Sequence, residues 1–317
     1  MLACLVYVLK RPHSKPAVLS QNFPVFSYRQ RSRGSILVVF EVCNYFLFNY
    51  FQHGGTMSLL IIGYGKMGRA LAKRWASKTN FDVSVVDPLA DSESVPKNIR
   101  LYTALEELEG QSFDALVIAL KPQVIAQLLP VYLPYLKSDG CLISIAAGFS
   151  IHSLEEIAGR ISIIRMMPNL PAEIGYGVTG FYQNKFAKED HCQTAKTLAE
   201  VTGFGLQVNS EDELDKVTAV AGSGTGYGFE IIRCWIEATV QLGFSPVVAR
   251  ELVQATMEGA VELTKRKPDS LTELRNSVTS PAGTTAAGLS VLRENKAMEK
   301  LMINTVNAAL QRAVELR

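Results

Sequence analysis

The sequence predicts an α/β protein with a doubly wound parallel sheet, followed by an all-α domain. Three observations predict this fold. Continuous apolar runs alternate with helical patterns between residues 58 and 210. A glycine-rich turn follows the first of these runs, and from residue 211 onward the pattern is helical only. Alternating strands and helices form parallel sheets, because a parallel connection needs a crossover segment.

Composition narrows the class of protein. The chain has 317 residues, of which 48% are hydrophobic and 20% are charged, as in an ordinary globular protein. Residues 1–56 hold six of the 32 basic and one of the 30 acidic residues. Residues 57–317 therefore have a small net negative charge, which predicts that the protein has no nucleic-acid partner. The five cysteines have no metal-site or disulfide spacing. This favours a reducing, cytoplasmic location and predicts no metal site.

The leader, residues 1–56, differs from the rest of the chain. It is rich in apolar and aromatic residues, lacks periodicity and contains three prolines. Its apolar stretch at 36–51 is short for a membrane span, and no signal-peptide cleavage pattern follows an early apolar core. Because Met57 leads directly into a predicted strand, we interpret the leader as a mis-assigned start or a disordered extension. A targeting segment and a membrane anchor are the alternatives.

The first predicted unit is a strand at 58–62, the turn GYGKMG, a helix from Met67 to about residue 77, and a strand at 82–86. This order is typical of a Rossmann-type dinucleotide-binding domain. The first glycine permits a tight turn, the second lets the backbone approach a pyrophosphate, and the third lets the helix pack on the strand. The free N–H groups at the helix start favour phosphate. The predicted cofactor-binding residues here are Gly63, Tyr64, Gly65, Lys66, Met67 and Gly68.

Asp87 ends the second strand, 24 residues after Gly63. An acid near this spacing binds the ribose hydroxyls of a dinucleotide and would repel a 2′-phosphate. Asp87 therefore favours NADH over NADPH. A neighbouring lysine or arginine could offset this effect, so either cofactor is consistent with the sequence.

Later strands are predicted at 115–120, 141–146, 161–166, 177–182 and 206–208, with helices at 123–136, 153–158 and 187–201. Three of these strands end in bend-forming pairs. Because ligands of such sheets bind at the carboxyl ends of the strands, we expect the pairs to converge with the glycine turn. They are Lys121 with Pro122, Ala147 with Gly148, and Pro168 with Asn169. His152 and His191 lie beside charged helical sequence and are predicted at the surface.

The second half, 211–317, contains predicted helices at 211–221, 227–242, 246–265, 270–276 and, with interruptions, 284–317. The first two are expected to join through a glycine-rich connection at 222–226. Helices with broad apolar faces predict packing against a partner subunit. The turn at 278–285 offers N–H and hydroxyl donors that suit a carboxylate. A helix cap made by Ser280 or Thr284 explains the same residues equally well.

Six motifs together resemble the pyrroline-5-carboxylate reductase family. They are GYGKMG (63–68), ALKP (119–122), AAG (146–148), RMMPNLPA (165–172), AGSGTGY (221–227) and VTSPAGTTAAGL (278–289). The resemblance covers residues 57–317. It implies a nucleotide-binding domain at 57–210 and a helical substrate and dimerisation domain at 211–317. It also implies NAD(P)H-dependent reduction of the cyclic imine 1-pyrroline-5-carboxylate to L-proline, in a homodimer or a decamer of dimers.

The resemblance also implies roles for single residues. The turn formed by Ala282, Gly283, Thr284 and Thr285 would hold the substrate carboxylate through backbone N–H groups. The Thr285 hydroxyl would lie near the ring nitrogen and assist proton delivery. Further residues along the cofactor would be Ala119, Leu120, Lys121, Pro122 and Ala147. The absence of a well-placed histidine agrees with this chemistry, because a protonated imine is already an electrophile.

The sequence departs from the family pattern at several small residues. Ala221, Thr225 and Gly226 replace serine, proline and alanine, and Ala282 replaces a glycine. Tyr176 and Ser277 stand where glutamate and asparagine are frequent. Two other functions would also use a Rossmann-type domain. A β-hydroxyacid dehydrogenase would need a catalytic lysine that residues 222–230 lack, and a nucleotide-binding scaffold would bind the cofactor without turnover.

Overall fold

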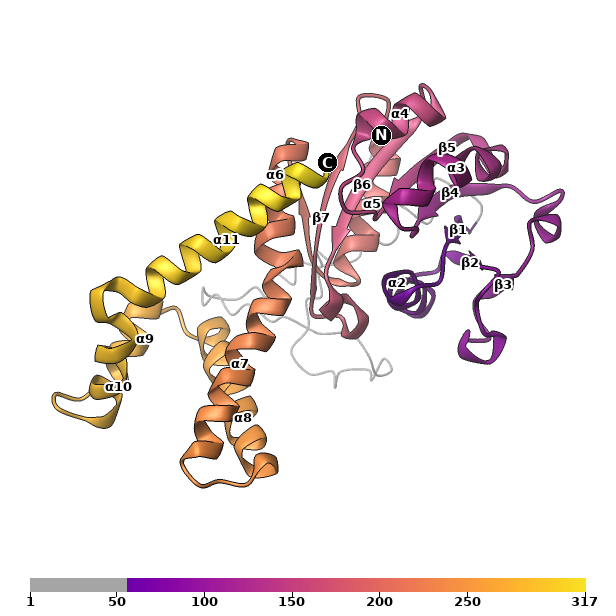
Figure 1. Cartoon of the computed structure of the whole chain (residues 1–317). Helices are drawn as coiled ribbons and strands as arrows, with labels where there is room; N and C mark the ends of the chain where they lie inside the picture. The colour runs from indigo at the N-terminus through magenta and orange to yellow at the C-terminus, as the bar shows by residue number, and fades with distance from the viewer. Residues whose placement is uncertain (1–55) are drawn as a thin grey trace, which may run out of the picture. The chain divides into compact units, whose positions relative to one another are not determined.

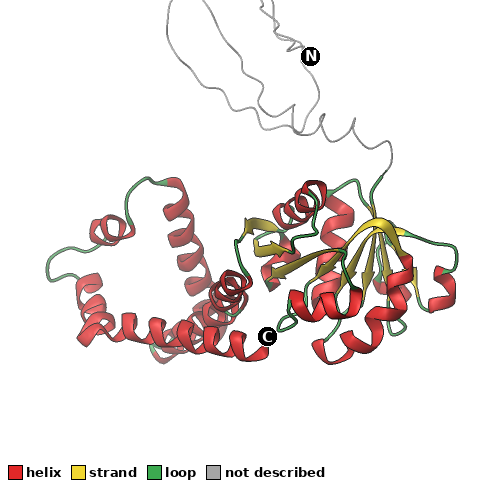
Figure 2. Ribbon diagram, turned by 90° about the horizontal axis from the view of Figure 1, so that it is seen from above, coloured by secondary structure: helices red, strands yellow, loops and turns green. Residues whose placement is uncertain are grey.

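The computed structural model describes residues 56–317, so the leader at 1–55 lies outside the described residues. Within this part, an eight-stranded sheet is followed by helices only (Figures 1 and 2). The strand order is β3-β2-β1-β4-β5-β6-β7-β8. The strands are β1 (Ser58–Ile62), β2 (Asp82–Val86), β3 (Arg100–Tyr102), β4 (Phe113–Ile118), β5 (Leu136–Ser144), β6 (Ser162–Pro168), β7 (Gly177–Gln183) and β8 (Gly203–Gln207).

The first six strands of the chain are parallel, as predicted, but the last two are not parallel to them. β7 pairs antiparallel with β6, and β8 pairs parallel with β7. The reason is the connection. Only residues 169–176, with the short 3-10 helix η4 (Leu170–Ile174), separate β6 from β7. A parallel crossover needs about a dozen residues or more, so this chain turns back instead.

Helices cover both faces of the sheet, and the side chains of β1 show how. Leu59 and Ile61 face a core shared with α2 (Lys66–Lys78) and α5 (Glu189–Glu200). Leu60 and Ile62 face the core on the other side, which is shared with α3 (Pro122–Tyr132) and α4 (Ile151–Ala158). Burial on both faces explains why the strand is a continuous apolar run.

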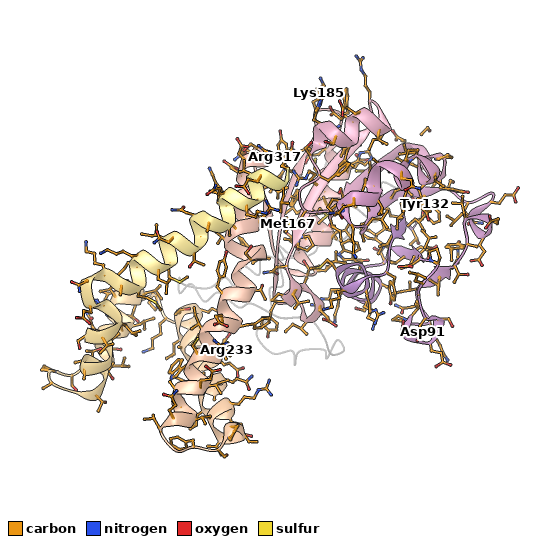
Figure 3. The ribbon with its side chains drawn as sticks, viewed as in Figure 1. Asp91, Tyr132, Met167, Lys185, Arg233 and Arg317 are labelled. Carbon is orange, nitrogen blue, oxygen red and sulfur yellow. The ribbon has the colours of Figure 1, made fainter. Side chains whose placement is uncertain are left out.

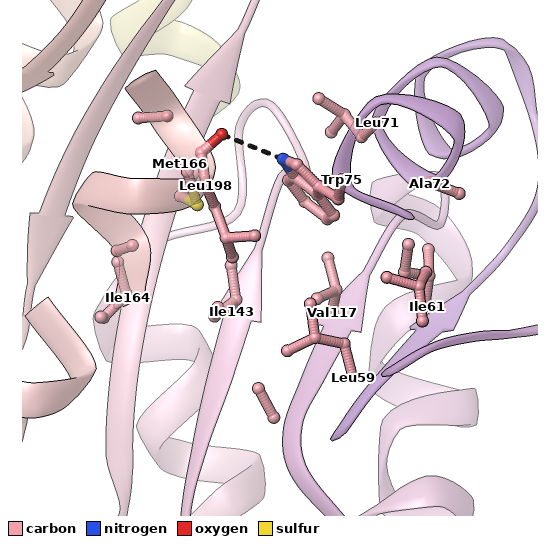
Figure 4. Close-up of a cluster of buried hydrophobic side chains, with 14 of the residues drawn as sticks. Leu59, Ile61, Leu71, Ala72, Trp75, Val117, Ile143, Ile164, Met166 and Leu198 are labelled. Atoms are coloured by element: carbon pink, nitrogen blue, oxygen red, sulfur yellow. Dashed lines mark hydrogen bonds between the residues drawn. The ribbon is translucent and has the colours of Figure 1, made fainter. Parts of the chain in front are cut away.

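A hydrogen bond inside the first core fixes α2 against α5. The indole N–H of Trp75 donates to the carbonyl oxygen of Leu198 at 3.0 Å, and both side chains are buried (Figure 4). Trp75 is thus fully packed and has its polar group satisfied. The helix that begins at the glycine turn is therefore held firmly on the sheet.

His191 is buried, although the sequence predicts it at the surface. Its side chain is buried, because the first turn of α5 lies over the start of β6. The Nδ1 atom lies 2.7 Å from the Ser162 Oγ, and Nε2 lies 3.0 Å from the carbonyl oxygen of Asp139. Burial lowers the pKa of His191. His152 is exposed, as predicted.

The helical half begins with α6 (Glu211–Val217), and the π-helical turn η5 (Thr218–Gly222) follows it. α7 begins at Gly224, so the predicted glycine-rich connection is itself helical. A Cβ at Gly222 would lie 3.2 Å from the Met167 Cε atom, so this glycine serves close packing on the sheet. The helices of the rest of this half are α7 (Gly224–Gln241), α8 (Pro246–Arg266), α9 (Leu271–Ser277), α10 (Thr284–Arg293) and α11 (Ala297–Leu316).

Other predicted elements need smaller corrections. The predicted helix at 123–136 ends at Tyr132, and β3 was not predicted because only three residues form it. The break between α10 and α11 lies at Asn295 and Lys296, whose φ angles are 51° and 57°. None of the helices between residues 56 and 317 is long and apolar enough to cross a membrane.

Candidate active site

The glycine turn connects β1 to α2, and each glycine has a distinct environment. Gly63 has φ +101°, and a Cβ there would lie 2.8 Å from the Ala119 carbonyl oxygen. A Cβ at Gly68 would lie 2.3 Å from the Gly63 carbonyl oxygen. A Cβ at Gly65, by contrast, would meet no other part of the described chain within 4 Å. Two glycines are therefore required by packing, and the third faces open space that a ligand could approach.

The start of α2 has no side-chain cap. Gly65 is the N-cap residue, and no side chain between residues 56 and 317 accepts a hydrogen bond from the first turn. The first N–H groups of a helix lack partners within the helix and carry a partial positive charge. Lys66 is exposed beside them. This helix end can therefore bind a pyrophosphate.

Backbone hydrogen bonds hold the strand ends in one row. The N–H of Gly63 donates to Val86 O at 2.9 Å, and the N–H of Ala119 donates to Ile62 O at 2.9 Å. The N–H of Ile145 donates to Ile118 O at 3.0 Å. The structure thus brings all of the predicted cofactor residues to the carboxyl edge of β1, β2, β4 and β5. These are residues 63–68, Asp87, residues 119–122 and Ala147.

Asp87 is fixed by two backbone donors. Its Oδ2 accepts from the N–H of Tyr64 at 2.7 Å, and its Oδ1 accepts from the N–H of Leu89 at 2.9 Å. The segment 87–96 contains Asp91 and Glu93 but no lysine or arginine. This segment therefore provides no cation that would offset Asp87.

Tyr64 contributes its backbone to the turn, whereas its side chain is 3% exposed and belongs to the core. The hydroxyl has no hydrogen-bond partner among the described residues. The Arg69 guanidinium lies over the ring, 5.3 Å from its centre. Burial raises the pKa of Tyr64, and Arg69 opposes this effect. The sequence pattern GYG gave no signal of this burial.

The predicted substrate turn lies before α10. Ala282 has φ 57°, a left-handed conformation in a residue that is not glycine. The N–H of Gly283 donates to Ser280 O at 3.0 Å and closes the turn. Gly283 is the N-cap of α10, and no side chain in the described part of the chain caps this helix. The alternative interpretation, a cap made by Ser280 or Thr284, is therefore wrong, and the N–H groups of Thr284 and Thr285 have no side-chain acceptor there.

One chain does not bring the two predicted parts of the site together. α9 and α10 lie at the end of the helical half, well away from β1 and α2 in both views (Figures 1 and 2). A groove of about 270 Å³ lies beside the substrate turn, and a cavity of about 480 Å³ lies near the end of α11. The groove is lined by Arg275, Asn276, Thr279, Ala286, Leu289, Ser290 and Arg293, and none of these is a predicted site residue.

The larger cavity has no predicted site residue in its lining either. It is lined by Ser150, His152, Tyr182, Ser210, Glu211, Asp212 and Arg317. Between residues 56 and 317, no group of three or more His, Cys, Asp or Glu side chains could hold a metal ion.

Comparisons with known proteins identify both halves of the chain. Residues 211–316 match the family model described as pyrroline-5-carboxylate reductase dimerisation. Residues 58–148 match the model described as NADP oxidoreductase, coenzyme F420-dependent. The start of the sheet and the helical half thus match two separate models.

Named relatives cover most of the chain. The pyrroline-5-carboxylate reductase of Pseudomonas aeruginosa is 36% identical over 64% of this chain and 74% of its own length. That of Haemophilus influenzae is 33% identical over 84% of this chain and 96% of its own length. A crystal structure of the Plasmodium falciparum pyrroline carboxylate reductase with NADP bound is 29% identical, with a TM-score of 0.73, over 83% of this chain and 99% of that one. The chain belongs to the pyrroline-5-carboxylate reductase family.

Proposed function

We propose that this chain reduces the cyclic imine 1-pyrroline-5-carboxylate to L-proline with a nicotinamide dinucleotide as reductant. One observation carries the proposal. In a member of this family, two helices begin without side-chain caps, α2 at the glycine turn and α10 at the turn 282–285. The first suits a pyrophosphate and the second suits a carboxylate.

The residues at the strand ends fit the dinucleotide. Gly65 leaves space for the pyrophosphate, and Asp87 is held in position to accept from ribose hydroxyls. Ala119, Leu120, Lys121, Pro122 and Ala147 lie along the same edge. When bound, the nicotinamide supplies the hydride that reduces the imine carbon.

The substrate is held by the turn before α10. The N–H groups of Thr284 and Thr285 bind the carboxylate, and the Thr285 hydroxyl lies beside the ring nitrogen and helps to keep it protonated. The protonated imine carries a positive charge on nitrogen, and hydride addition at carbon neutralises it. No strong acid is needed for this step, so positioning supplies much of the rate acceleration.

The complete site requires two copies of the chain. Within one chain the turn and the cofactor edge lie apart, while α7 to α11 leave most of their side chains exposed. The match to a dimerisation domain supports a partner on these helices. The turn of one copy would therefore meet the cofactor edge of the other. The homodimer, the decamer of dimers, the cytoplasmic location and the domain boundaries at 57–210 and 211–317 stay predictions.

A mixing experiment tests the two-copy site. Gly65→Asp places a side chain and a negative charge where the pyrophosphate would lie, and Thr285→Val removes the hydroxyl. Each variant alone should have low activity. A mixed dimer should regain activity, because one of its two sites combines the intact glycine turn with the intact substrate turn. If the activity of a purified mixed dimer stays low, each active site takes its glycine turn and its substrate turn from the same chain, and the two-copy site is wrong.

The reaction itself is tested with the purified chain. Loss of absorbance of NADH or NADPH is followed on addition of pyrroline-5-carboxylate, and L-proline is measured as the product. Absence of cofactor oxidation with both NADH and NADPH would overturn the proposed function and favour a scaffold that binds nucleotide without turnover.

We also propose a preference for NADH. Asp87 and the acidic segment after it would repel a 2′-phosphate. The value of kcat/KM should be higher with NADH than with NADPH. Asp87→Ala should lower kcat/KM for NADH by about tenfold to a hundredfold, since a charged hydrogen bond contributes about 1.5–3 kcal/mol, and should leave NADPH less affected. Equal losses with both cofactors would remove Asp87 from ribose binding.

A further inference from the structure

The end of α11 packs directly against the loop that follows β5. Gly148 in this loop has φ +70°. A Cβ at this position would lie 2.5 Å from the carbonyl oxygen of Leu316 and 3.0 Å from its Cβ. The loop and the end of the helix are thus in close contact. Gly148 directly follows Ala147, which lies along the proposed cofactor edge.

Charged side chains fix the same end of α11. The Arg317 Nη1 lies 2.7 Å from Asp212 Oδ1 and 3.1 Å from Asp215 Oδ2. The Asp212 side chain is 73% exposed, so that pair is screened by water and contributes little. The Asp215 side chain is 4% exposed, and its Oδ2 makes no aligned hydrogen bond within the described chain. Arg317 therefore provides the nearby positive charge that this buried carboxylate oxygen requires.

A second ion pair continues the network into the sheet. The guanidinium of Arg165 in β6 pairs with Glu211, the first residue of α6, and the Arg165 side chain is 4% exposed. Glu211 Oε1 also accepts from the N–H of Ile151 at 3.0 Å. Burial raises the pKa of Asp215, and the positive charges of Arg317 and Arg165 oppose this effect. The two arginines and their acids thus connect α11, α6, β6 and the start of α4.

The contacts at the end of α11 reach the proposed active site. α11 has 20 residues and is about 30 Å long. It packs against α10, which carries the turn 282–285, and its other end lies at the sheet (Figures 1 and 3). Arg317 is labelled at that end. One rigid helix thus extends from the substrate half to a loop of the cofactor edge.

We propose that Arg317 and Leu316 are positioning residues for cofactor binding, an inference that rests on the proposed function. Leu316 supports the loop of Ala147 and Gly148 by direct contact. Arg317 holds the end of α11 in place through the buried Asp215. When Arg317 is lost, the end of the helix is released, the loop loses its support, and the dinucleotide binds less tightly.

The test measures NADH binding to the full chain. Arg317→Ala should raise the Kd for NADH about fivefold to tenfold, a size typical of coupling between sites. The KM for the imine should stay unchanged, and Arg317→Lys should restore most of the NADH affinity because it keeps the positive charge. Arg312→Ala is the matched control. Among the described residues Arg312 pairs with Glu315 of the same helix, so its loss should leave NADH binding unchanged.

A pair of glycine variants tests the contact by another route. Gly148→Ala inserts a Cβ into the end of α11 and should weaken NADH binding in the same direction. Gly110 has a similar φ of +74°, but a Cβ there would meet nothing within 4 Å in the described chain, so Gly110→Ala imposes the same backbone strain without the contact. Gly110→Ala should lower the Tm without changing the Kd for NADH.

The outcomes separate this inference from the proposed function. If the unsubstituted chain binds neither NADH nor NADPH, the proposed function fails and this inference fails with it. If it binds NADH and Arg317→Ala binds equally tightly, only the positioning role is overturned. The same holds if Arg317→Ala and Arg312→Ala weaken binding equally, or if Arg317→Lys restores the Tm but not the NADH affinity.

Discussion

The sheet and the helices after it differ in how much of their apolar surface one chain buries. Both faces of the sheet have a core, and the apolar side chains of β1 and β4 are almost completely buried. In α7 to α11, by contrast, the only buried residues are Thr239, Ala249, Val253 and Ala313. A helix needs tertiary packing of its apolar face to be stable. The first half therefore completes its hydrophobic core within one chain, whereas the helices of the second half need a further surface to cover their apolar side chains.

The two halves also differ in their uncapped helix ends. The start of α2 lies in a turn whose glycines fit the packing around them. The start of α10 follows Ala282, which adopts a left-handed conformation at a cost that glycine would avoid. The glycine turn at 63–68 is therefore relaxed, and the turn at 282–285 is strained. The four predictions below test these differences, beginning with the largest effect.

Trp235→Glu should have the largest effect. Trp235 is 43% exposed and lies on the same side of α7 as Ile231 and as Leu242, the residue that ends the helix, and both of these are also exposed. A charge on this face should prevent association, so the molar mass falls to that of one chain and activity is lost. Light scattering and the NADH assay measure both.

The matched control for Trp235→Glu lies in the other half. Val131 is 41% exposed on α3, and Val131→Glu should leave the molar mass unchanged. If Trp235→Glu keeps the mass and activity of the unsubstituted protein, this face of α7 is not the interface.

Thr285→Val should lower kcat by about a hundredfold, which is typical for loss of a group that assists proton transfer. The Kd for NADH should stay constant, because the hydroxyl acts on the imine nitrogen and not on the dinucleotide. Thr285→Ser keeps the hydroxyl and should retain most of the activity. Stopped-flow and binding measurements separate the two effects, and an unchanged kcat would exclude a role for the hydroxyl.

Ala282→Gly should stabilise the turn. Glycine avoids the cost of about 1–2 kcal/mol that a left-handed conformation imposes on other residues, but it loses about 0.4–1 kcal/mol through its freedom in the unfolded chain. The net gain should be about 0.5–1 kcal/mol, measured by chemical denaturation. Ala287→Gly, inside α10, should instead destabilise by about 1 kcal/mol. A loss of stability in Ala282→Gly would show that the turn carries no strain.

Tyr64→Phe should have the smallest effect. The Tyr64 hydroxyl is buried without a partner among the described residues, so its removal should leave stability unchanged or raise it by up to about 1 kcal/mol. Trp75→Phe, which loses the hydrogen bond to Leu198, should lower stability. If Tyr64→Phe weakens NADH binding, the hydroxyl contacts the cofactor rather than the protein core.

Much of the sheet could be predicted because burial on two faces leaves a simple pattern. Leu59 to Ile62 are all apolar for this reason, and the glycine turn follows from the strand–helix connection. The direction of β7 was not predictable from its own residues, because the length of the connection before it decides the direction. The surface position predicted for His191 was wrong, because charged neighbours in the sequence do not determine which face of the helix carries the His191 side chain.

The site was predictable in part for the same reasons. Sequence spacing placed Asp87 near the glycine turn, and the predicted strand ends placed Lys121 and Pro122 there, because strand ends of a parallel sheet meet at one edge. No pattern in the sequence indicates the burial of Tyr64 or the contact of Leu316 with Gly148. The first depends on the shape of the core, and the second joins residues that are far apart in the chain.

The π-helical turn η5 lies between α6 and α7 and determines how the faces of these two helices are oriented about the helix axis. A turn of this kind contains one residue more than an α-helical turn, and one residue corresponds to a rotation of about 100° about the helix axis. The faces of α7 are therefore rotated relative to those of α6. Removing a single residue from Thr218–Gly222 would rotate Ile231, Trp235 and Leu242 together about the axis of α7, without changing any of their side chains.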